Sequence, residues 1–108
     1  MENHKVLFHI DESEKWSLLL SNISNLLAAA ENVSVEAVAN SAAVRFYIAE
    51  HPLMDDLAAS GVVFCACANA LRGAEISADA LPSYVRVVPA GVLEIMEQQE
   101  AGYCYIKP

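Results

Sequence analysis

Cys67 ends an apolar segment at the point where the sequence pattern changes from strand to helix. Residues 61–67 (GVVFCAC) read as a strand, and residues 68–73 (ANALRG) read as the start of a helix. The first turn of a helix has unpaired backbone N–H groups and a partial positive charge, which favour a thiolate over a thiol. Thiolate is the form that attacks sulfur and carbon electrophiles. Cys67 is therefore the candidate nucleophile, and the alternative interpretation is a small buried hydrophobic residue.

Cys65 and Cys67 form a C-x-C element, and on a strand both side chains would point to the same face. That arrangement is compatible with redox chemistry or with half of a metal site. A disulfide between them would need a backbone turn, and the common zinc spacing of C-x2-C with a second ligand pair is absent from the sequence. We therefore expect no metal site, and we expect Cys65 and Cys104 to be buried packing residues.

Three further polar residues have two interpretations each. His9 lies inside an apolar strand, where it is either a hydrogen-bonded core histidine or a base toward Cys67. Asp11 follows that strand and is expected to cap the first helix, a role compatible with an acid at the strand end. Arg72, five residues after Cys67, either stabilises an anion in a crevice or pairs with an acidic residue at the surface. The structural role is the one we favour for His9 and Arg72.

The loop at residues 11–15 (DESEK) argues against a phosphate-bearing cofactor. Folds that bind nucleotides or flavins hold phosphate with glycines, hydroxyls and a helix N-terminus on this first loop. Here three carboxylates would repel a phosphate, and neither a G-x-G-x-x-G nor a P-loop pattern occurs in the sequence. We expect no cofactor.

Composition excludes several classes of partner. Six Lys and Arg residues against 14 Asp and Glu give a formal net charge of −8, so nucleic acids and anionic membranes are poor partners. No apolar run approaches the ~18 residues that span a bilayer, and the first residues do not resemble a signal peptide. The odd number of cysteines favours reduced thiols and a cytoplasmic protein. A hydrophobic content of 56% in 108 residues indicates a homo-oligomer.

Short apolar runs alternate with helical patterns along the whole chain. The expected strands lie at residues 5–10, 33–39, 62–66, 85–88 and 103–106. The expected helices lie at residues 16–30, 42–49, 52–60, 67–72 and 89–101. Continuous apolar strands belong to a parallel sheet that is covered on both faces. The sequence thus predicts one α/β domain over residues 1–108, a three-layer, doubly wound, mainly parallel five-stranded sheet.

The expected strand order is the flavodoxin-like 2-1-3-4-5. In that order the crevice lies between the carboxyl ends of the first and third strands. Cys67 would then lie beside His9 and Asp11. Asn40 and Ser41 end the second strand and would lie on the other side of the first strand.

Three segments resemble the DsrE/DsrF-like (YchN-like) family: residues 62–73 (VVFCACANALRG), 86–92 (RVVPAGV) and 99–108 (QEAGYCYIKP). The strand at residues 6–11 and the helix at 16–27 also fit, so the resemblance covers nearly the whole chain. It implies a small α/β subunit that assembles into trimers or hexamers. It also implies a reactive cysteine after the third strand. Cys67 matches that position and is followed by Asn69 and Leu71.

Two functions follow from these observations. In sulfur-relay members of the family the cysteine carries persulfide sulfur between donor and acceptor proteins, and in this chain Asn69 and the helix N–H groups would stabilise the charge on the terminal sulfur. Relatives often have a His-Gly pair where this chain has Asn40-Ser41, which leaves open the role of that position. The alternative function is a non-catalytic oligomeric module that binds a small ligand or a partner protein and in which Cys67 is incidental.

Overall fold

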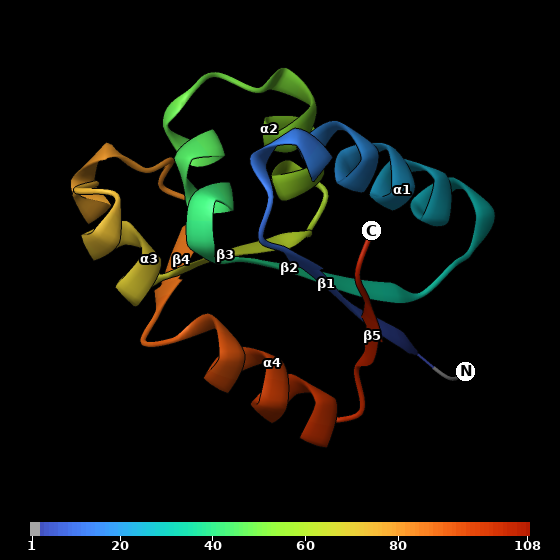
Figure 1. Cartoon of the computed structure of the whole chain (residues 1–108). Coiled ribbons are helices and arrows are strands. Elements are labelled where there is room, and N and C mark those ends of the chain that lie inside the picture. Colours follow the sequence, from blue (N-terminus) through green and yellow to red (C-terminus); the bar gives the residue numbers. More distant parts are fainter. Residues whose placement is uncertain (1–2) are drawn as a thin grey trace.

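The sheet has five strands that all run parallel (Figure 1). The structure is a computed structural model and describes residues 3–108. Its strands are β1 (His4–Ile10), β2 (Val33–Ala39), β3 (Val63–Cys67), β4 (Val85–Val88) and β5 (Cys104–Ile106). Each lies within a residue or two of an apolar run in the sequence. The predicted α/β class and parallel sheet are therefore confirmed.

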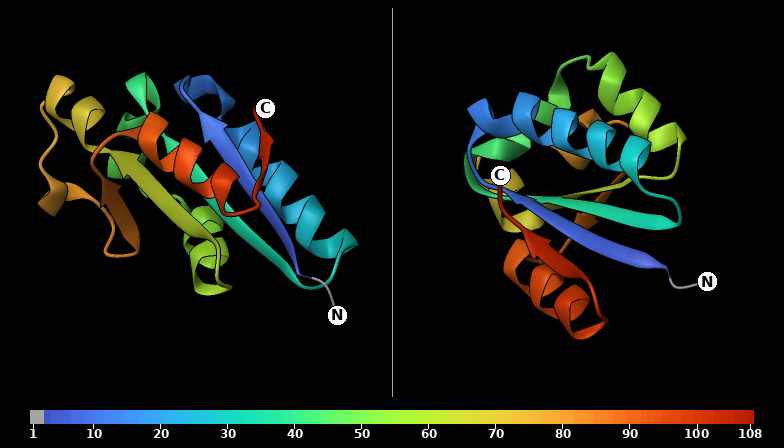
Figure 2. Two further views of the ribbon diagram at one scale, coloured as in Figure 1. Left: turned by 90° about the horizontal axis from the view of Figure 1, so that it is seen from below. Right: turned by 90° about the vertical axis from the view of Figure 1, so that its right-hand side faces the viewer.

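Helices cover both faces of this sheet. The α-helices are α1 (Trp16–Ala29), α2 (Pro52–Ala59), α3 (Ala68–Gly73) and α4 (Gly91–Glu100), and the 3-10 helices are η1 (Ser13–Lys15), η2 (Ser41–Ile48) and η3 (Ala78–Ala80). Helices α1 and α2 lie on one face and α4 lies on the other (Figures 1 and 2). Within residues 3–108 no helix is long and apolar enough to cross a membrane.

The strand order is β4-β3-β2-β1-β5, so the expected flavodoxin-like order is wrong. Three consecutive crossovers, through α1, through η2 and α2, and through α3, each step to the next strand in the same direction. The crossover through α4 then returns past β1 to place β5. Because such crossovers are right-handed, the reversed step must put α4 on the opposite face. Apolar periodicity reveals the strands but not their neighbours.

This order moves the crevice. Adjacent strands β3 and β4 are followed by helices on opposite faces, so the topological switch point lies at their carboxyl ends. Cys67 is the last residue of β3, and its partner in β4 is Val88. Asn40 follows β2, which lies between β1 and β3, and not on the far side of β1 as expected.

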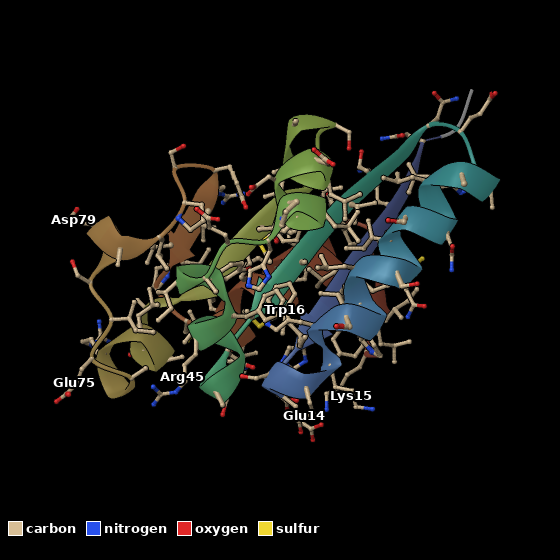
Figure 3. All side chains as sticks on the ribbon, turned by 90° about the horizontal axis from the view of Figure 1, so that it is seen from above. Glu14, Lys15, Trp16, Arg45, Glu75 and Asp79 are labelled. Carbon is tan, nitrogen blue, oxygen red and sulfur yellow. The ribbon has the colours of Figure 1, made fainter. Side chains whose placement is uncertain are left out.

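The larger core lies under α1, η2 and α2 (Figure 3). Trp16 is fully buried there, stacked on Phe46 at 4.8 Å between ring centroids and edge-on to Tyr47 at 5.2 Å. Its indole N–H donates to the Ala43 carbonyl, and the Tyr47 hydroxyl donates to the Cys65 carbonyl. The first bond holds η2 to α1, and the second holds η2 to β3. The α4 face has a smaller buried cluster, which consists of Leu7, Val38, Cys65 and Val88.

Candidate functional site

Cys67 lies where two strand ends meet the beginning of α4. It is the last residue of β3 and the residue immediately before α3, and 6% of it is exposed. Gly91, the first residue of α4, lies directly against it: a methyl group at Gly91 would be 3.5 Å from Cβ of Cys67 and 3.1 Å from Cβ of Asn40. The contact with Asn40 would be tighter than an ordinary van der Waals contact, so glycine lets α4 approach β2 and β3 without a shift of the neighbouring side chain.

The first turn of α4 lies beside the thiol and carries both backbone N–H groups and the Glu94 side chain. Helix α4 has ten residues. The N–H groups of its first turn have no carbonyl acceptor within the helix. They give the helix start a partial positive charge beside Cys67. The predicted position of Cys67 at a strand-to-helix switch is confirmed. Helix α3 follows Cys67 in the chain, and α4 packs against Cys67 in space.

A chain of hydrogen bonds orients Asn40. The Tyr105 hydroxyl lies 2.6 Å from Nδ1 of His9, and Nε2 of His9 lies 3.0 Å from Oδ1 of Asn40. An amide oxygen only accepts, so Nε2 donates and Nδ1 accepts from Tyr105. The oxygen of Asn40 is thereby turned toward His9. The Asn40 nitrogen Nδ2 faces the start of α4, 3.5 Å from where a methyl group on Gly91 would lie.

The other predicted residues lie outside this arrangement. Asn69 and Arg72 are exposed on α3, where the guanidinium donates to the Asn69 amide oxygen, so Arg72 pairs with an amide and not with the expected acid. Asp11 does not cap a helix. The residue before η1 is Glu12, and Asp11 instead forms an ion pair with Lys107 at 3.4 Å, at the end of β1.

The model of the DsrE/DsrF-like family matches residues 13–108. The chain belongs to this family. A solved structure of a DsrE-like fold, the protein of unknown function MTH1491 from Methanobacterium thermoautotrophicum, is 38% identical, covers 98% of this chain and 100% of its own, and superposes with a TM-score of 0.91. None of the curated proteins compared with the chain matches it.

This DsrE/DsrF-like chain also buries two carboxyl groups that the sequence analysis did not single out. Glu36, in the middle of β2, is 3% exposed, and Glu94, on α4, is 7% exposed. Glu36 offered a signal, because it is the one charged residue in an otherwise apolar strand (VSVEAVA). Its partner on α4 is visible only in the fold.

The two carboxyl groups have pKa values shifted in opposite directions. Burial, followed by the contact with Glu94, raises the pKa of Glu36 to about 8, and the nearby Arg86 only partly opposes this. The hydrogen bond from Glu36 lowers the pKa of Glu94. The Glu94 carboxylate also accepts a hydrogen bond from the Gln98 amide at 3.0 Å. Burial also raises the pKa of the Cys65 thiol, which lies between them and is fully buried, as expected.

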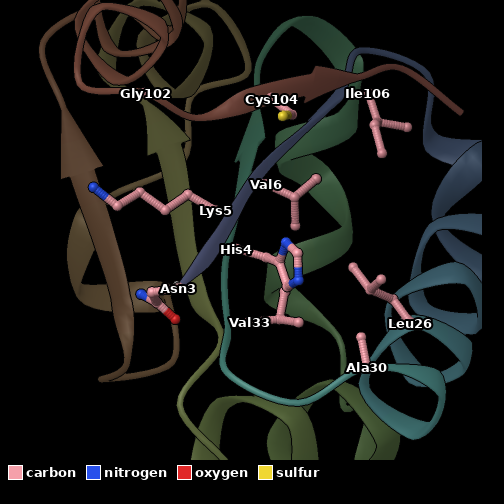
Figure 4. Close-up of a pocket in the computed structure, with 10 residues that line it drawn as sticks. All are labelled: Asn3, His4, Lys5, Val6, Leu26, Ala30, Val33, Gly102, Cys104 and Ile106. Carbon is pink, nitrogen blue, oxygen red and sulfur yellow. The ribbon is translucent and has the colours of Figure 1, made fainter. Parts of the chain in front are cut away.

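A pocket of about 440 Å³ lies away from Cys67, and Figure 4 shows the residues that line it. Its lining includes His4 and Val33, the first residues of β1 and β2, whereas Cys67 lies at the carboxyl ends of the strands. Cys104 also lines it and is exposed, so the expectation that Cys104 is a buried packing residue is wrong. The reason is that β5 is an edge strand that α1 does not reach across.

Proposed function

We propose that this protein carries sulfane sulfur as a persulfide on Cys67. The Cys67 thiolate attacks the outer sulfur of a donor persulfide R–S–SH. A new S–S bond forms to Cys67, the donor S–S bond breaks, and the donor leaves as the thiolate R–S⁻. An acceptor thiolate then attacks the outer sulfur and releases Cys67 as a thiolate. The two steps move one sulfur atom with no net oxidation or reduction.

The observation that carries the proposal is the close packing of Gly91 against both Cys67 and Asn40. It brings the positive end of α4 and the N–H groups of an oriented amide to the same point as the thiol. Developing negative charge on sulfur is stabilised by such fixed donors and dipoles. Membership of the DsrE/DsrF-like family gives the chemistry a sulfur-relay context.

In this proposal His9 is a positioning residue and not a base toward the thiol. Its Nε2–H donates to Asn40, which follows β2, the strand between those of His9 and Cys67. Asn40 therefore takes the stabilising role that the sequence analysis gave to Asn69, which is held by Arg72 on α3. The free thiols fit a reducing compartment such as the cytoplasm.

Sulfur loading tests the proposal. The protein is incubated with glutathione persulfide, and peptide mass spectrometry locates any added sulfur. We expect one sulfur atom on Cys67, loss of that label in Cys67→Ala, and retention of it in Cys104→Ala, the matched control. A label that survives Cys67→Ala, or no label at all in the parent protein, contradicts the proposal and favours the non-catalytic binding module.

We further propose that the chain self-associates through the outer side of α4. Val92, Leu93 and Met96 are 69%, 38% and 50% exposed there. In η2, by contrast, Ala43, Val44 and Tyr47 are buried in the core of the same chain, although Ile48 is 54% exposed. The family resemblance favours a trimer or a hexamer. Sedimentation equilibrium should show an oligomer that Val92→Glu dissociates and that Leu18→Glu, at an equally apolar exposed site on α1, leaves intact.

A further inference from the structure

Three side chains with metal-ligating atoms converge in the layer between the sheet and α4. Glu36 comes from β2, Cys65 from β3 and Glu94 from α4. One ligand atom from each lies within 4.8 Å of those of the other two, and all three residues are buried. The ligands come from three separate elements, so they form no short sequence motif such as C-x2-C.

An independent observation indicates that this cluster lacks a ligand. Oε2 of Glu36 is buried and has no hydrogen-bonding partner within residues 3–108. Its other oxygen lies 4.0 Å from Nη1 of Arg86, beyond hydrogen-bonding distance. An orphaned carboxylate oxygen in the interior is costly unless a proton or a cation satisfies it.

We propose that Glu36, Cys65 and Glu94 bind one divalent transition-metal ion, for which Zn²⁺ is the best match. Two carboxylates and a thiolate form a mixed oxygen and sulfur set that Zn²⁺ accepts, whereas Mg²⁺ and Ca²⁺ require oxygen ligands. The charges also balance. The three ionised ligands carry one negative charge each, and Zn²⁺ together with the Arg86 guanidinium beside Glu36 neutralises them.

The geometry requires only a small contraction. Tetrahedral Zn²⁺ holds oxygen and sulfur at about 2.0–2.3 Å, so its ligand atoms lie about 3.3–3.8 Å apart. Atoms within 4.8 Å of one another reach that spacing by side-chain rotation and a slight approach of α4. Three protein ligands leave a fourth position for water or for the Gln98 amide oxygen, whose side chain already contacts Glu94.

The metal site is separate from the thiol that carries sulfur. Cys65 precedes Cys67 by two residues on the same face of β3, so the cluster lies deeper under α4. The proposal can therefore be tested without the persulfide chemistry. The parent for the experiment is the full chain with Cys67→Ala and Cys104→Ala, which leaves Cys65 as its one thiol.

Isothermal titration with Zn²⁺, after treatment with a chelator, measures the affinity and the stoichiometry in this parent. We expect one ion per chain. Removing a ligand by Glu36→Gln or Cys65→Ala should weaken binding by more than the ~10- to 100-fold that loss of a second-shell partner costs. Glu97→Gln removes the same charge from an exposed position of α4 and should leave binding unchanged. Co²⁺ in place of Zn²⁺ should give a thiolate-to-cobalt charge-transfer band that Cys65→Ala abolishes.

Circular dichroism of the metal-free variants shows that each one folds before it is titrated. Absence of stoichiometric binding in the parent overturns the proposal. Binding that survives both Glu36→Gln and Cys65→Ala overturns it equally, because the ion would then be held elsewhere.

Discussion

The two faces of the sheet are built from the same strands but have different contents. The face under α1, η2 and α2 is apolar and aromatic, with Trp16, Tyr47 and Phe64 packed edge-on or tilted against one another. The face under α4 has a small apolar cluster and buries Glu36 and Glu94 beside it. The first face supplies most of the hydrophobic stabilisation. The second keeps polar groups and thiols close together where water is excluded.

Alternation along each strand produces this division. On β3, Phe64 and Ala66 point into the aromatic core, while Cys65 and Cys67 point toward α4. A single strand thus contributes to stability and to the candidate chemistry at neighbouring positions. Because α4 covers one face while α1, η2 and α2 cover the other, substitutions on the two faces should differ in kind.

The largest difference should appear in stability. Trp16→Ala removes the centre of the aromatic core and should cost about 3–5 kcal/mol, much of the 5–15 kcal/mol typical of a domain. Val88→Ala on the α4 face removes two methyl groups and should cost about 2 kcal/mol at ~0.8 kcal/mol per buried carbon plus a cavity. Urea denaturation measures both. Equal losses would show that the two faces contribute alike.

The second difference is the response to pH, measured with a chelator present so that the cluster is free of metal. The folded-state pKa of Glu36, about 8, exceeds the value of 4.5 for an ordinary glutamate. The folded protein then binds more protons than the unfolded one, and the free energy of unfolding falls as pH rises from about 4.5 to about 8. A difference of one pKa unit between the folded and unfolded states changes the free energy of unfolding by about 1.4 kcal/mol. The lowered pKa of Glu94 has the opposite effect and makes the total decline smaller.

Glu36→Gln should remove that decline, since an amide does not titrate. Unfolding by urea at pH 5.5 and pH 8.0 gives the comparison, and Glu97→Gln is the control on an exposed position. A decline that persists unchanged in Glu36→Gln would place its origin in the general repulsion of an acidic chain.

Sequence patterns predicted the elements of both faces better than the contacts between them. Apolar runs located all five strands, and the change of pattern after residue 66 located Cys67. The order of the strands was missed, since hydrophobic periodicity does not specify which strands pair. That error put Asn40 on the wrong side of β1. The contact between Glu36 and Glu94 joins distant parts of the chain and has no local signal beyond a charge in an apolar strand.

A third comparison concerns access to the thiol. Gly91→Ala would put a methyl group 3.1 Å from Cβ of Asn40 and 3.5 Å from Cβ of Cys67, so the start of α4 must move. We expect alkylation of Cys67 by iodoacetamide to change several-fold in rate, while Cys65 stays the slowest thiol because it is fully buried and its pKa is raised. Gly73→Ala is the control, because nothing lies within 4 Å of its added methyl group. Identical rates in both variants would contradict the close-approach argument.

The smallest effect tests how far the α4 face depends on the orientation of a single amide. Tyr105→Phe removes the hydroxyl that donates to Nδ1 of His9, so the tautomer that donates from Nε2 to Asn40 is less favoured. Loss of this one hydrogen bond should lower the free energy of unfolding by about 1 kcal/mol. In this variant the persulfide loading of Cys67 should slow a few-fold with little change in the urea midpoint. His9→Gln can still donate a hydrogen bond to Asn40, so it should load sulfur faster than His9→Ala. Tyr84→Phe is the matched control, because its hydroxyl donates to Asp55, a residue of α2 on the other face. Equal slowing by both tyrosine variants would mean that the effect is general, and the His9 chain would then have no part in positioning Asn40.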